Sequence, residues 1–227
     1  MYMLNRSAKF LRGFLLSYGP KAIKRRLWNR EFASGKWSFI DHTVGDCVYP
    51  ILEKFARKGR ILDLGCGPGN TATELTCDAY SSYLGVDISE EALAKAANRT
   101  ESSGRAHKNR FAQADILGFK PEEQFDVILF RESMYHIPIG SILSVLDKYS
   151  QYLADWGVFI VRMYTKVNGN PKHRPMKMIE LIASNFDVVE EYQYSESGAA
   201  VIVFRPRRAA ENWMSACEAV RPIDTTF

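Results

Sequence analysis

The sequence predicts an α/β fold, in which a mostly parallel, doubly wound sheet is covered by helices on both faces and ends in an antiparallel strand. Nearly continuous apolar strands alternate with helical segments from about residue 60 onward, which is typical of a parallel sheet buried on both faces. A glycine-rich turn follows the first of these strands. Two final strands, 186–192 and 199–205, flank a short Ser/Glu/Gly turn and predict a hairpin.

Composition indicates one good-sized globular domain with an appendage. The chain has 227 residues, of which 46% are hydrophobic and 25% charged, and no apolar run approaches the roughly 20 residues that a membrane span needs. Arg12 and Gly13 interrupt the short apolar stretch near the N-terminus, so we expect no signal peptide. The four cysteines, Cys47, Cys66, Cys77 and Cys217, form no C-x-x-C pair. We therefore expect reduced thiols in a cytoplasmic protein and no metal site.

The N-terminal segment is strongly basic. Residues 1–40 contain nine Lys and Arg and one acid, a charge of +8, whereas the remaining 21 bases and 25 acids give −4. Apolar residues at helical spacing predict two amphipathic helices broken at Gly19-Pro20. The excess charge fits a solvated helix face. It would also suit an anionic surface, such as nucleic acid or phospholipid headgroups, or an acidic substrate.

The predicted organisation has three parts. A helical cap spans residues 1–58, an α/β core spans 59–206, and a tail without a clear pattern spans 207–227. The last helix of the cap covers about 43–57, where Pro50 predicts a kink or a late start. Helices of the core are expected at 72–77, 92–98, 141–153 and 176–184.

The first core strand, Ile61–Leu64, runs into glycines at 65, 67 and 69. Glycine permits a sharp strand-to-helix turn and lets a ligand approach the main chain. The spacing is G-x-G-x-G, which differs from the G-x-G-x-x-G of dinucleotide binders, and the Lys-Ser/Thr of a phosphate-binding loop is absent. By itself, this turn suits several nucleotide cofactors.

Acids end the next two strands. Asp87 closes the strand 83–87, 22 residues after Gly65, and Asp115 lies near the end of the strand 110–116. A carboxylate at the end of the second strand lies beside the glycine turn, where it can accept hydrogen bonds from ribose hydroxyls. The alternative role of Asp87, capping the next helix, is already filled by Ser89. Two more strands are predicted at 125–130 and 156–161.

These motifs together resemble class I S-adenosylmethionine-dependent methyltransferases. The matching segments are Leu62-Asp63-Leu64-Gly65-Cys66-Gly67-Pro68-Gly69, Gly85-Val86-Asp87-Ile88-Ser89, Gln113-Ala114-Asp115-Ile116, Phe125-Asp126-Val127-Ile128 and Trp156-Gly157-Val158-Phe159-Ile160. They occur in the family's order and spacing over about residues 60–205. The resemblance implies a Rossmann-like sheet of seven strands with an antiparallel last strand.

The resemblance also implies the cofactor site. Gly65, Cys66 and Gly67 would approach S-adenosylmethionine, with Asp63 near its amino-acid end. Asp87 would hold the ribose, Asp115 and Ile116 the adenine, and Ile88 would pack on the adenine ring. Arg131, after the fourth strand, is available for an anionic group. These cofactor-site residues are Asp63, Gly65, Cys66, Gly67, Asp87, Ile88, Asp115, Ile116 and Arg131.

Candidates for the chemistry follow the fourth strand. His136 titrates near neutrality and could act as a general base or line the pocket, while Glu132 and Tyr135 could orient an amine or hydroxyl. Arg162 and Tyr164, after the fifth strand, are weaker candidates, as is His42 on a lid.

Several motifs are absent. No Asn/Asp-Pro-Pro-Tyr/Phe follows the fourth strand, no Pro-Cys pair is present, and the paired glutamates of arginine methyltransferases are missing. We therefore expect methylation of an O or N atom of a small molecule, such as a sugar or secondary-metabolite intermediate, with an anionic acceptor suiting the basic segment. An RNA methyltransferase and a non-catalytic cofactor-binding module stay open. The glycine spacing and the missing Tyr-x-x-x-Lys disfavour a nicotinamide-dependent oxidoreductase.

Overall fold

The computed structural model describes residues 2–38, 43–167, 170–171 and 173–207. Its helices are α1 (Tyr2–Tyr18), α2 (Lys21–Ala33), α3 (Val48–Ala56), α4 (Asn70–Glu74), α5 (Glu90–Ser102), α6 (Ile142–Ser150) and α7 (His173–Asn185). Its strands are β1 (Arg60–Leu64), β2 (Ser82–Asp87), β3 (Asn109–Gln113), β4 (Phe125–Arg131), β5 (Leu153–Tyr164), β6 (Lys166–Val167), β7 (Asn170–Pro171), β8 (Asp187–Tyr194) and β9 (Ala199–Arg205).

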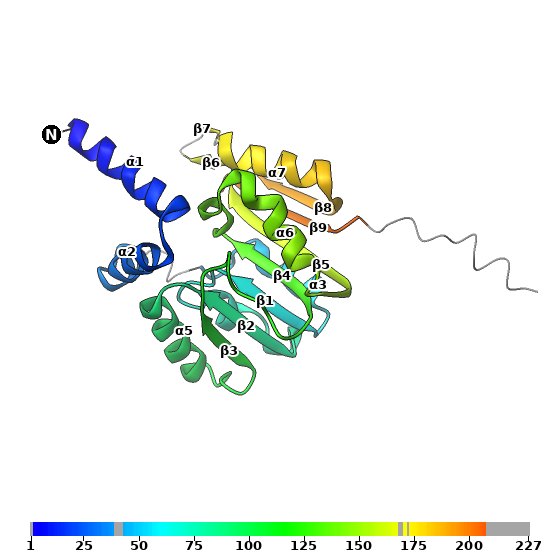
Figure 1. Cartoon of the computed structure of the whole chain (residues 1–227). Helices are drawn as coiled ribbons and strands as arrows, with labels where there is room; N and C mark the ends of the chain where they lie inside the picture. Colours follow the sequence, from blue (N-terminus) through cyan, green and yellow to red (C-terminus); the bar gives the residue numbers. More distant parts are fainter. Residues whose placement is uncertain (1, 39–42, 168–169, 172, 208–227) are drawn as a thin grey trace, which may run out of the picture.

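Seven of these strands form one sheet in the order β3-β2-β1-β4-β5-β9-β8 (Figure 1). The first five are parallel, and β9 pairs antiparallel with both β5 and β8. The chain leaves β1 toward β2 and β3, and then crosses to the other side at β4. Ligands of doubly wound sheets bind at such a switch point, beyond the carboxyl ends of the strands. The predicted fold class is therefore confirmed.

Two apolar clusters cover the sheet because alternate side chains of each strand point to opposite faces. Ile61, Val127 and Leu129 pack with residues of α3 and α4. Leu62 and Ile128, one position on, pack instead with residues of α6 and α7. The central strands are buried on both faces, which explains their continuous apolar sequence.

The cap begins with two helices, as predicted. α1 ends at Tyr18 and α2 starts at Lys21, so Gly19 and Pro20 form the break. Proline suits this place because it fixes φ and needs no hydrogen-bond partner for its nitrogen at a helix start. Figure 1 shows α1 and α2 at the end of the molecule toward which the arrowheads of β1, β2 and β4 point. The cap therefore faces the ligand-binding edge of the sheet.

Several boundaries differ from the prediction. α3 starts late, at Val48, which places Pro50 in the first turn, where its missing N–H costs no helical hydrogen bond. β3 ends at Gln113, so Asp115 belongs to the following loop. The boundaries of the three predicted parts stay predictions, and residues 208–227 of the tail lie outside the described residues.

Candidate functional site

A cavity of about 980 Å³ opens between the carboxyl edge of the sheet and the helical cap. One side of the cavity, the strand-end wall, contains residues of the turns after β1, β2, β3 and β4. The opposite side, the cap wall, contains residues of α1 and α2 together with Trp37 and residues 43–47. A cavity of this volume, enclosed between two layers of the protein, is typical of a small-molecule site.

The glycine turn forms the floor of the cavity. Gly65 has φ +85°, and a Cβ atom there would lie 2.4 Å from the Cβ of Ser133. Gly67 has φ +54°, and a Cβ there would meet only a distant atom of Phe32, at 3.8 Å. Gly65 is therefore required by the packing of β1 against the turn after β4. Gly67 keeps the main chain open to the cavity, as the cofactor prediction requires.

The Cys66 side chain lies against the neighbouring strand rather than acting in the cavity. Its sulfur would be 2.8 Å from a Cβ at Gly85, and its side chain is buried. Burial, with smaller effects from Asp87 and Asp63, raises the pKa of the thiol well above its usual value. Cys66 lines the cavity but carries an inert neutral thiol.

Asp87 lies at the predicted place, at the end of β2 beside the glycine turn. Its two oxygens accept hydrogen bonds from the backbone N–H groups of Gly67, at 2.9 Å, and Ser89, at 2.8 Å. Burial raises the pKa of Asp87, and these backbone donors oppose the rise. Each carboxylate oxygen retains a lone pair for a further donor. Ser89 caps α5 by accepting from Ala92, as expected.

Asp63 lies beneath the cavity and not on its surface. Its Oδ2 accepts from the Tyr83 hydroxyl at 2.6 Å, while its buried Oδ1 has no hydrogen-bond partner among the described residues. Burial raises the pKa of Asp63 to about 6, against the lowering effects of Tyr83 and Arg131. The predicted role near the amino-acid end of a cofactor would therefore depend on one buried acceptor atom of a residue that does not line the cavity.

Asp115, Ile116 and Ile88 line the cavity at its β2–β3 side. Asp115 Oδ1 accepts from the backbone N–H of Leu117 at 3.0 Å. Its other oxygen lies 3.6 Å from the buried ammonium of Lys24, which comes from α2 of the cap. Lys24 thus connects the two walls where the resemblance implies the adenine.

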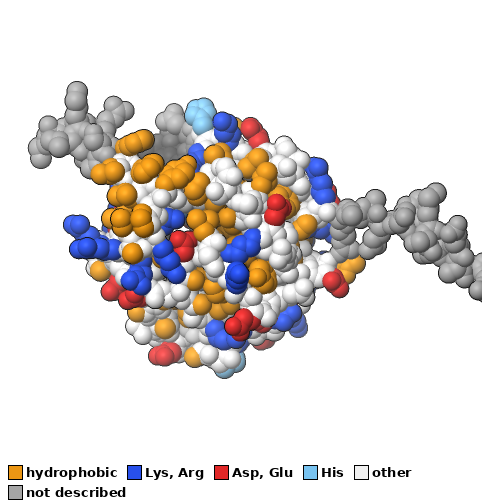
Figure 2. Space-filling model, in the orientation of Figure 1, with side chains coloured by type: hydrophobic (Ala, Val, Ile, Leu, Met, Phe, Trp, Pro, Cys, Tyr) orange, Lys and Arg blue, Asp and Glu red, His pale blue; other side chains and the backbone are white. Residues whose placement is uncertain are grey.

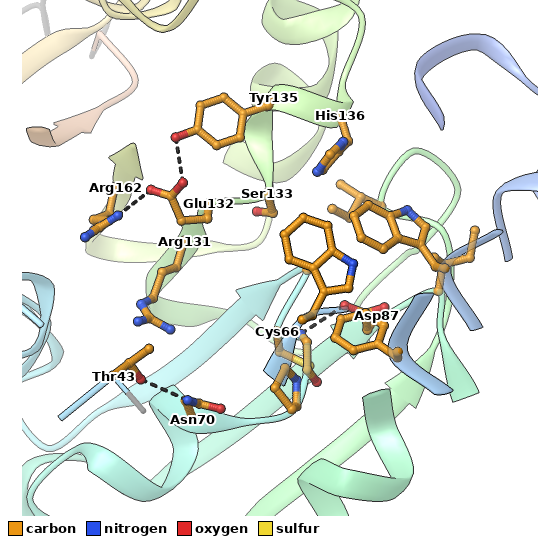
Figure 3. A pocket seen from close by; sticks show the side chains of 18 of the residues that line it. Thr43, Cys66, Asn70, Asp87, Arg131, Glu132, Ser133, Tyr135, His136 and Arg162 are labelled. Atoms are coloured by element: carbon orange, nitrogen blue, oxygen red, sulfur yellow. Dashed lines mark hydrogen bonds and ion pairs between the residues drawn. The ribbon is translucent and has the colours of Figure 1, made fainter. Parts of the chain in front are cut away.

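Opposite this side, two arginines and two acids form a compact charged cluster, of which Figure 3 labels Arg131, Arg162 and Glu132. Asp46 accepts from Arg131 at 2.8 Å and from Arg162 at 3.3 Å. Arg162 also donates to Glu132 at 2.5 Å. The two arginines, through their charges, hold the pKa of Asp46 below its usual value against the effect of burial. Asp46 is a cavity residue that sequence reasoning missed.

The structure brings Glu132 and Tyr135 together. The Tyr135 hydroxyl donates to Glu132 at 2.7 Å and accepts from the backbone N–H of Tyr164 at 2.6 Å. Burial and the nearby Glu132 carboxylate raise the pKa of Tyr135, so the phenol stays protonated. Glu132 has φ +55°, a left-handed conformation that is uncommon for glutamate and often marks a functional site.

His136 lines the cavity but packs against the cap. Its ring meets the ring of Trp28 edge to face, with centroids 4.9 Å apart. Burial, together with the positive charges of Arg12 and Arg174, lowers the pKa of His136 to about 4. The imidazole is therefore neutral at physiological pH, and the environment resists its protonation.

The cap wall holds most of the residues that sequence reasoning missed. Trp28 and Phe32 of α2, and Trp37 beyond it, line the cavity with Lys24. Glu31 anchors this wall by accepting from Trp37 Nε1 at 2.9 Å and from Arg12 and Lys36. The proposed lid residue His42 lies outside the described residues, whereas Arg162 and Tyr164 do line the cavity.

The described part of the chain contains no group of three His, Cys, Asp or Glu side chains arranged to hold a metal ion. None of its helices is long and apolar enough to cross a membrane.

Comparisons with known proteins agree with this geometry. A family model described as a methyltransferase domain matches residues 37–216. The ubiquinone biosynthesis O-methyltransferase of Pseudomonas fluorescens is 30% identical over 67% of this chain and 62% of its own length. The trans-aconitate 2-methyltransferase of Methylobacterium nodulans is 32% identical over 55% of this chain and 45% of its own length. The chain thus spans less than two thirds of these relatives.

Solved structures show the same fold. The N-methyltransferase NodS from Bradyrhizobium japonicum, in complex with S-adenosyl-L-homocysteine, has a TM-score of 0.64 at 20% identity, covering 81% of this chain and 98% of NodS. A S-adenosylmethionine-dependent methyltransferase from Thiobacillus denitrificans has a TM-score of 0.55 at 17% identity, covering 73% and 93%. Because the family model matches more than half of the chain, the resemblance to class I S-adenosylmethionine-dependent methyltransferases is confirmed, and the chain belongs to the methyltransferase-domain family.

Proposed function

We propose that the protein binds S-adenosylmethionine on the strand-end wall and methylates an O or N atom of a neutral small molecule held against the cap wall. The observation that carries this proposal is the position of Asp87 beside the open main chain of Gly67. A ribose on this turn would find a buried carboxylate with free lone pairs, and the cofactor would find no side chain at Gly67 in its way.

The charge of the cavity suits this cofactor. The charged side chains that line it are Lys24, Arg131, Arg162, Asp46, Asp87, Asp115 and Glu132. With His136 neutral, three bases and four acids leave one net negative charge. S-adenosylmethionine carries a sulfonium, an ammonium and a carboxylate, and so one net positive charge. The two balance, which limits the cost of burying both.

Two unpaired polar atoms support a place for the amino-acid end. Asp63 Oδ1 is a buried acceptor and Arg131 Nε a buried donor, and in the part of the chain that the structure describes neither has a hydrogen-bond partner. Arg131 is close enough to lower the pKa of Asp63 through its charge. An ammonium needs an acceptor and a carboxylate needs a donor, so this pair suits an amino-acid group.

The bound cofactor supplies an activated methyl group, and the chain's own residues then have to position the acceptor. Glu132 is the best placed for this, since its carboxylate is fixed by Arg162 and by the Tyr135 hydroxyl. A carboxylate held this way can accept a hydrogen bond from an acceptor hydroxyl or amine and take its proton. His136 would line the pocket, because its burial disfavours the imidazolium that a general base must become.

The acceptor is proposed to be neutral. The basic N-terminal segment suggested an anionic acceptor, but Arg131 and Arg162 are both paired with acids inside the cavity. Trp28, Phe32 and Trp37 offer mainly aromatic surface. This wall suits a flat or apolar body with one polar group directed at Glu132.

Calorimetry with S-adenosyl-L-homocysteine tests the cofactor assignment, with NAD as the matched control. We expect binding of the first only, and binding of NAD alone would overturn the proposal. A turnover screen over neutral and anionic small molecules then tests the acceptor assignment.

The second candidate is a non-methylating role. SpnF, a [4+2]-cyclase, has a TM-score of 0.55 to this chain at 16% identity, and this likeness shows that the fold also hosts other chemistry. Cofactor binding without turnover of the bound methyl group, on any acceptor, would favour a non-methylating role over the one proposed.

A further inference from the structure

The outer face of the cap carries a large apolar surface. Phe10, Leu11, Phe14 and Tyr18 of α1 are 77%, 57%, 51% and 59% exposed. They lie on one side of the helix, since Phe10, Phe14 and Tyr18 follow one another at intervals of four. The opposite side of α1 is buried at Leu16. Such an apolar row on a surface helix indicates a binding face.

Basic side chains lie beside this row. Lys21, Arg26 and Arg30 of α2 are exposed, and none of them forms an ion pair with the described residues. Figure 2 shows the apolar side chains gathered over α1 and the Lys and Arg side chains next to them over α2. We name this surface the α1–α2 patch and define it by Phe10, Leu11, Phe14, Tyr18, Lys21, Arg26 and Arg30.

The patch is separate from the cavity. On α2, Lys24, Trp28 and Phe32 follow one another at intervals of four and line the cavity. Arg26 and Arg30 lie on the other side of the same helix, because they are offset from that row by about half a turn. Lys21, at the start of α2, is on the cavity side by this spacing but does not line the cavity, and neither do the other residues of the patch.

We propose that the α1–α2 patch docks the protein on the surface of an anionic phospholipid bilayer. An apolar helix face bordered by basic residues is the arrangement that lies in a membrane interface, with aromatic and aliphatic side chains among the acyl chains and cations at the headgroups. The inference is independent of the proposed methyl transfer.

Charge complementarity favours a bilayer over other occupants. Residues 1–40 contain a single acid, Glu31, and that acid is buried and occupied by Arg12, Lys36 and Trp37. A second copy docked about a two-fold axis would place basic side chains against basic side chains. Nucleic acid would pair with the cations but would leave the exposed rings of Phe10 and Phe14 without an apolar partner.

Flotation of the full chain with vesicles tests the proposal. We expect it to float with vesicles of equal parts phosphatidylglycerol and phosphatidylcholine, to release at high salt, and to stay unbound with phosphatidylcholine alone. The paired substitution Arg26→Glu/Arg30→Glu should weaken binding by about twentyfold or more, because each lost cation weakens it about fivefold. Phe10→Ser/Phe14→Ser should weaken binding by about a hundredfold, because each buried ring contributes about tenfold.

Matched control variants show whether an effect comes from the position of a substitution or only from its change in charge or polarity. Lys120→Glu/Lys177→Glu makes the same charge change at exposed sites away from the patch, and Met176→Ser/Val189→Ser makes a similar apolar-to-polar change. Both should bind vesicles like the parent chain, and circular dichroism should show all variants folded.

Three outcomes would overturn the proposal. In the first, the parent chain does not bind anionic vesicles. In the second, patch and control variants lose binding equally. In the third, the patch binds another occupant. Light scattering would then show a dimer that Phe10→Ser/Phe14→Ser dissociates, or the chain would bind RNA, in a salt-sensitive way, in preference to vesicles.

Discussion

The strand-end wall and the cap wall of the cavity are built in different ways. On the strand-end wall, Gly65, Gly67 and Asp87 are positioned by backbone hydrogen bonds and by strands buried on both faces. On the cap wall, side chains hold one another, as Glu31 holds Arg12, Lys36 and Trp37. The first wall is fixed by local chain geometry and the second by contacts between distant residues.

This difference suggests a division of labour. A cofactor shared by a whole family needs a rigid site built by main-chain geometry, whereas a particular acceptor is selected by side chains that can be exchanged without disturbing the sheet. We therefore expect changes on the strand-end wall to affect cofactor affinity and folding, and changes on the cap wall to affect acceptor use. Four substitutions test this division.

The largest effect is expected from Asp87→Ala. Two charge-assisted hydrogen bonds to the ribose contribute about 3–6 kcal/mol, so affinity for S-adenosyl-L-homocysteine should fall by about 10²–10⁴-fold. Calorimetry measures this, with the exposed Asp147→Ala as control. Asp87→Asn retains one acceptor and should lose less. Affinity near that of the parent chain in the alanine variant would remove the ribose assignment.

Gly65→Ala should destabilise the fold itself. The φ of +85° costs an alanine about 1–2 kcal/mol, and the clash of its Cβ with Ser133 adds about 1–3 kcal/mol. Urea unfolding should show a total loss of about 3 kcal/mol in the free energy of unfolding. Adding Ser133→Gly should recover the part due to the clash, and Ser133→Gly alone provides the reference for the lost hydroxyl, which donates to Leu64. Additive losses in the double variant would mean that the two residues do not compete for space.

The same division separates the parts of the site that the sequence predicts from those that it does not. Strand ends and short spacings locate the glycine turn, Asp87 and Asp115, and a local pattern also predicts the hairpin of β8 and β9. Asp46 could not be found that way, because its partner Arg131 lies 85 positions away and only the packing of the cap on the sheet joins them. Gly45-Asp46 before a helix is the one local signal, and it also fits an ordinary helix start.

The role of His136 shows a different limit. A histidine after β4 suggests a residue that titrates near neutrality, but titration depends on burial, which the cap imposes through Trp28. The residue type was evident from the sequence, while its protonation was decided by a contact across the cavity.

The pH dependence of stability should reveal this burial. The pKa of His136 falls from 6.5 when unfolded to about 4 when folded, so the unfolded chain takes up a proton first, and stability is lost as the pH falls from about 6.5 to about 4. The loss should be about 3 kcal/mol by the linkage relation.

Asp63, whose folded pKa of about 6 lies above its unfolded value, changes stability in the opposite direction over a similar range of pH. The comparison must therefore be between the parent chain and His136→Gln, in which Asp63 is unchanged. Parallel curves of unfolding free energy against pH would show that His136 is solvated.

The smallest expected effect is that of Trp28→Ala, and it is the most direct test of the division. The ring of Trp28 lines the cavity and packs on His136, so its loss should weaken acceptor binding by about 1–2 kcal/mol, or roughly tenfold in KM. Affinity for S-adenosyl-L-homocysteine should change by less than that. The control is Trp156→Ala, which removes the same side chain from an exposed position on β5. If Trp28→Ala weakens cofactor binding more than acceptor binding, the two walls do not serve separate ligands, and the cap closes over the cofactor itself.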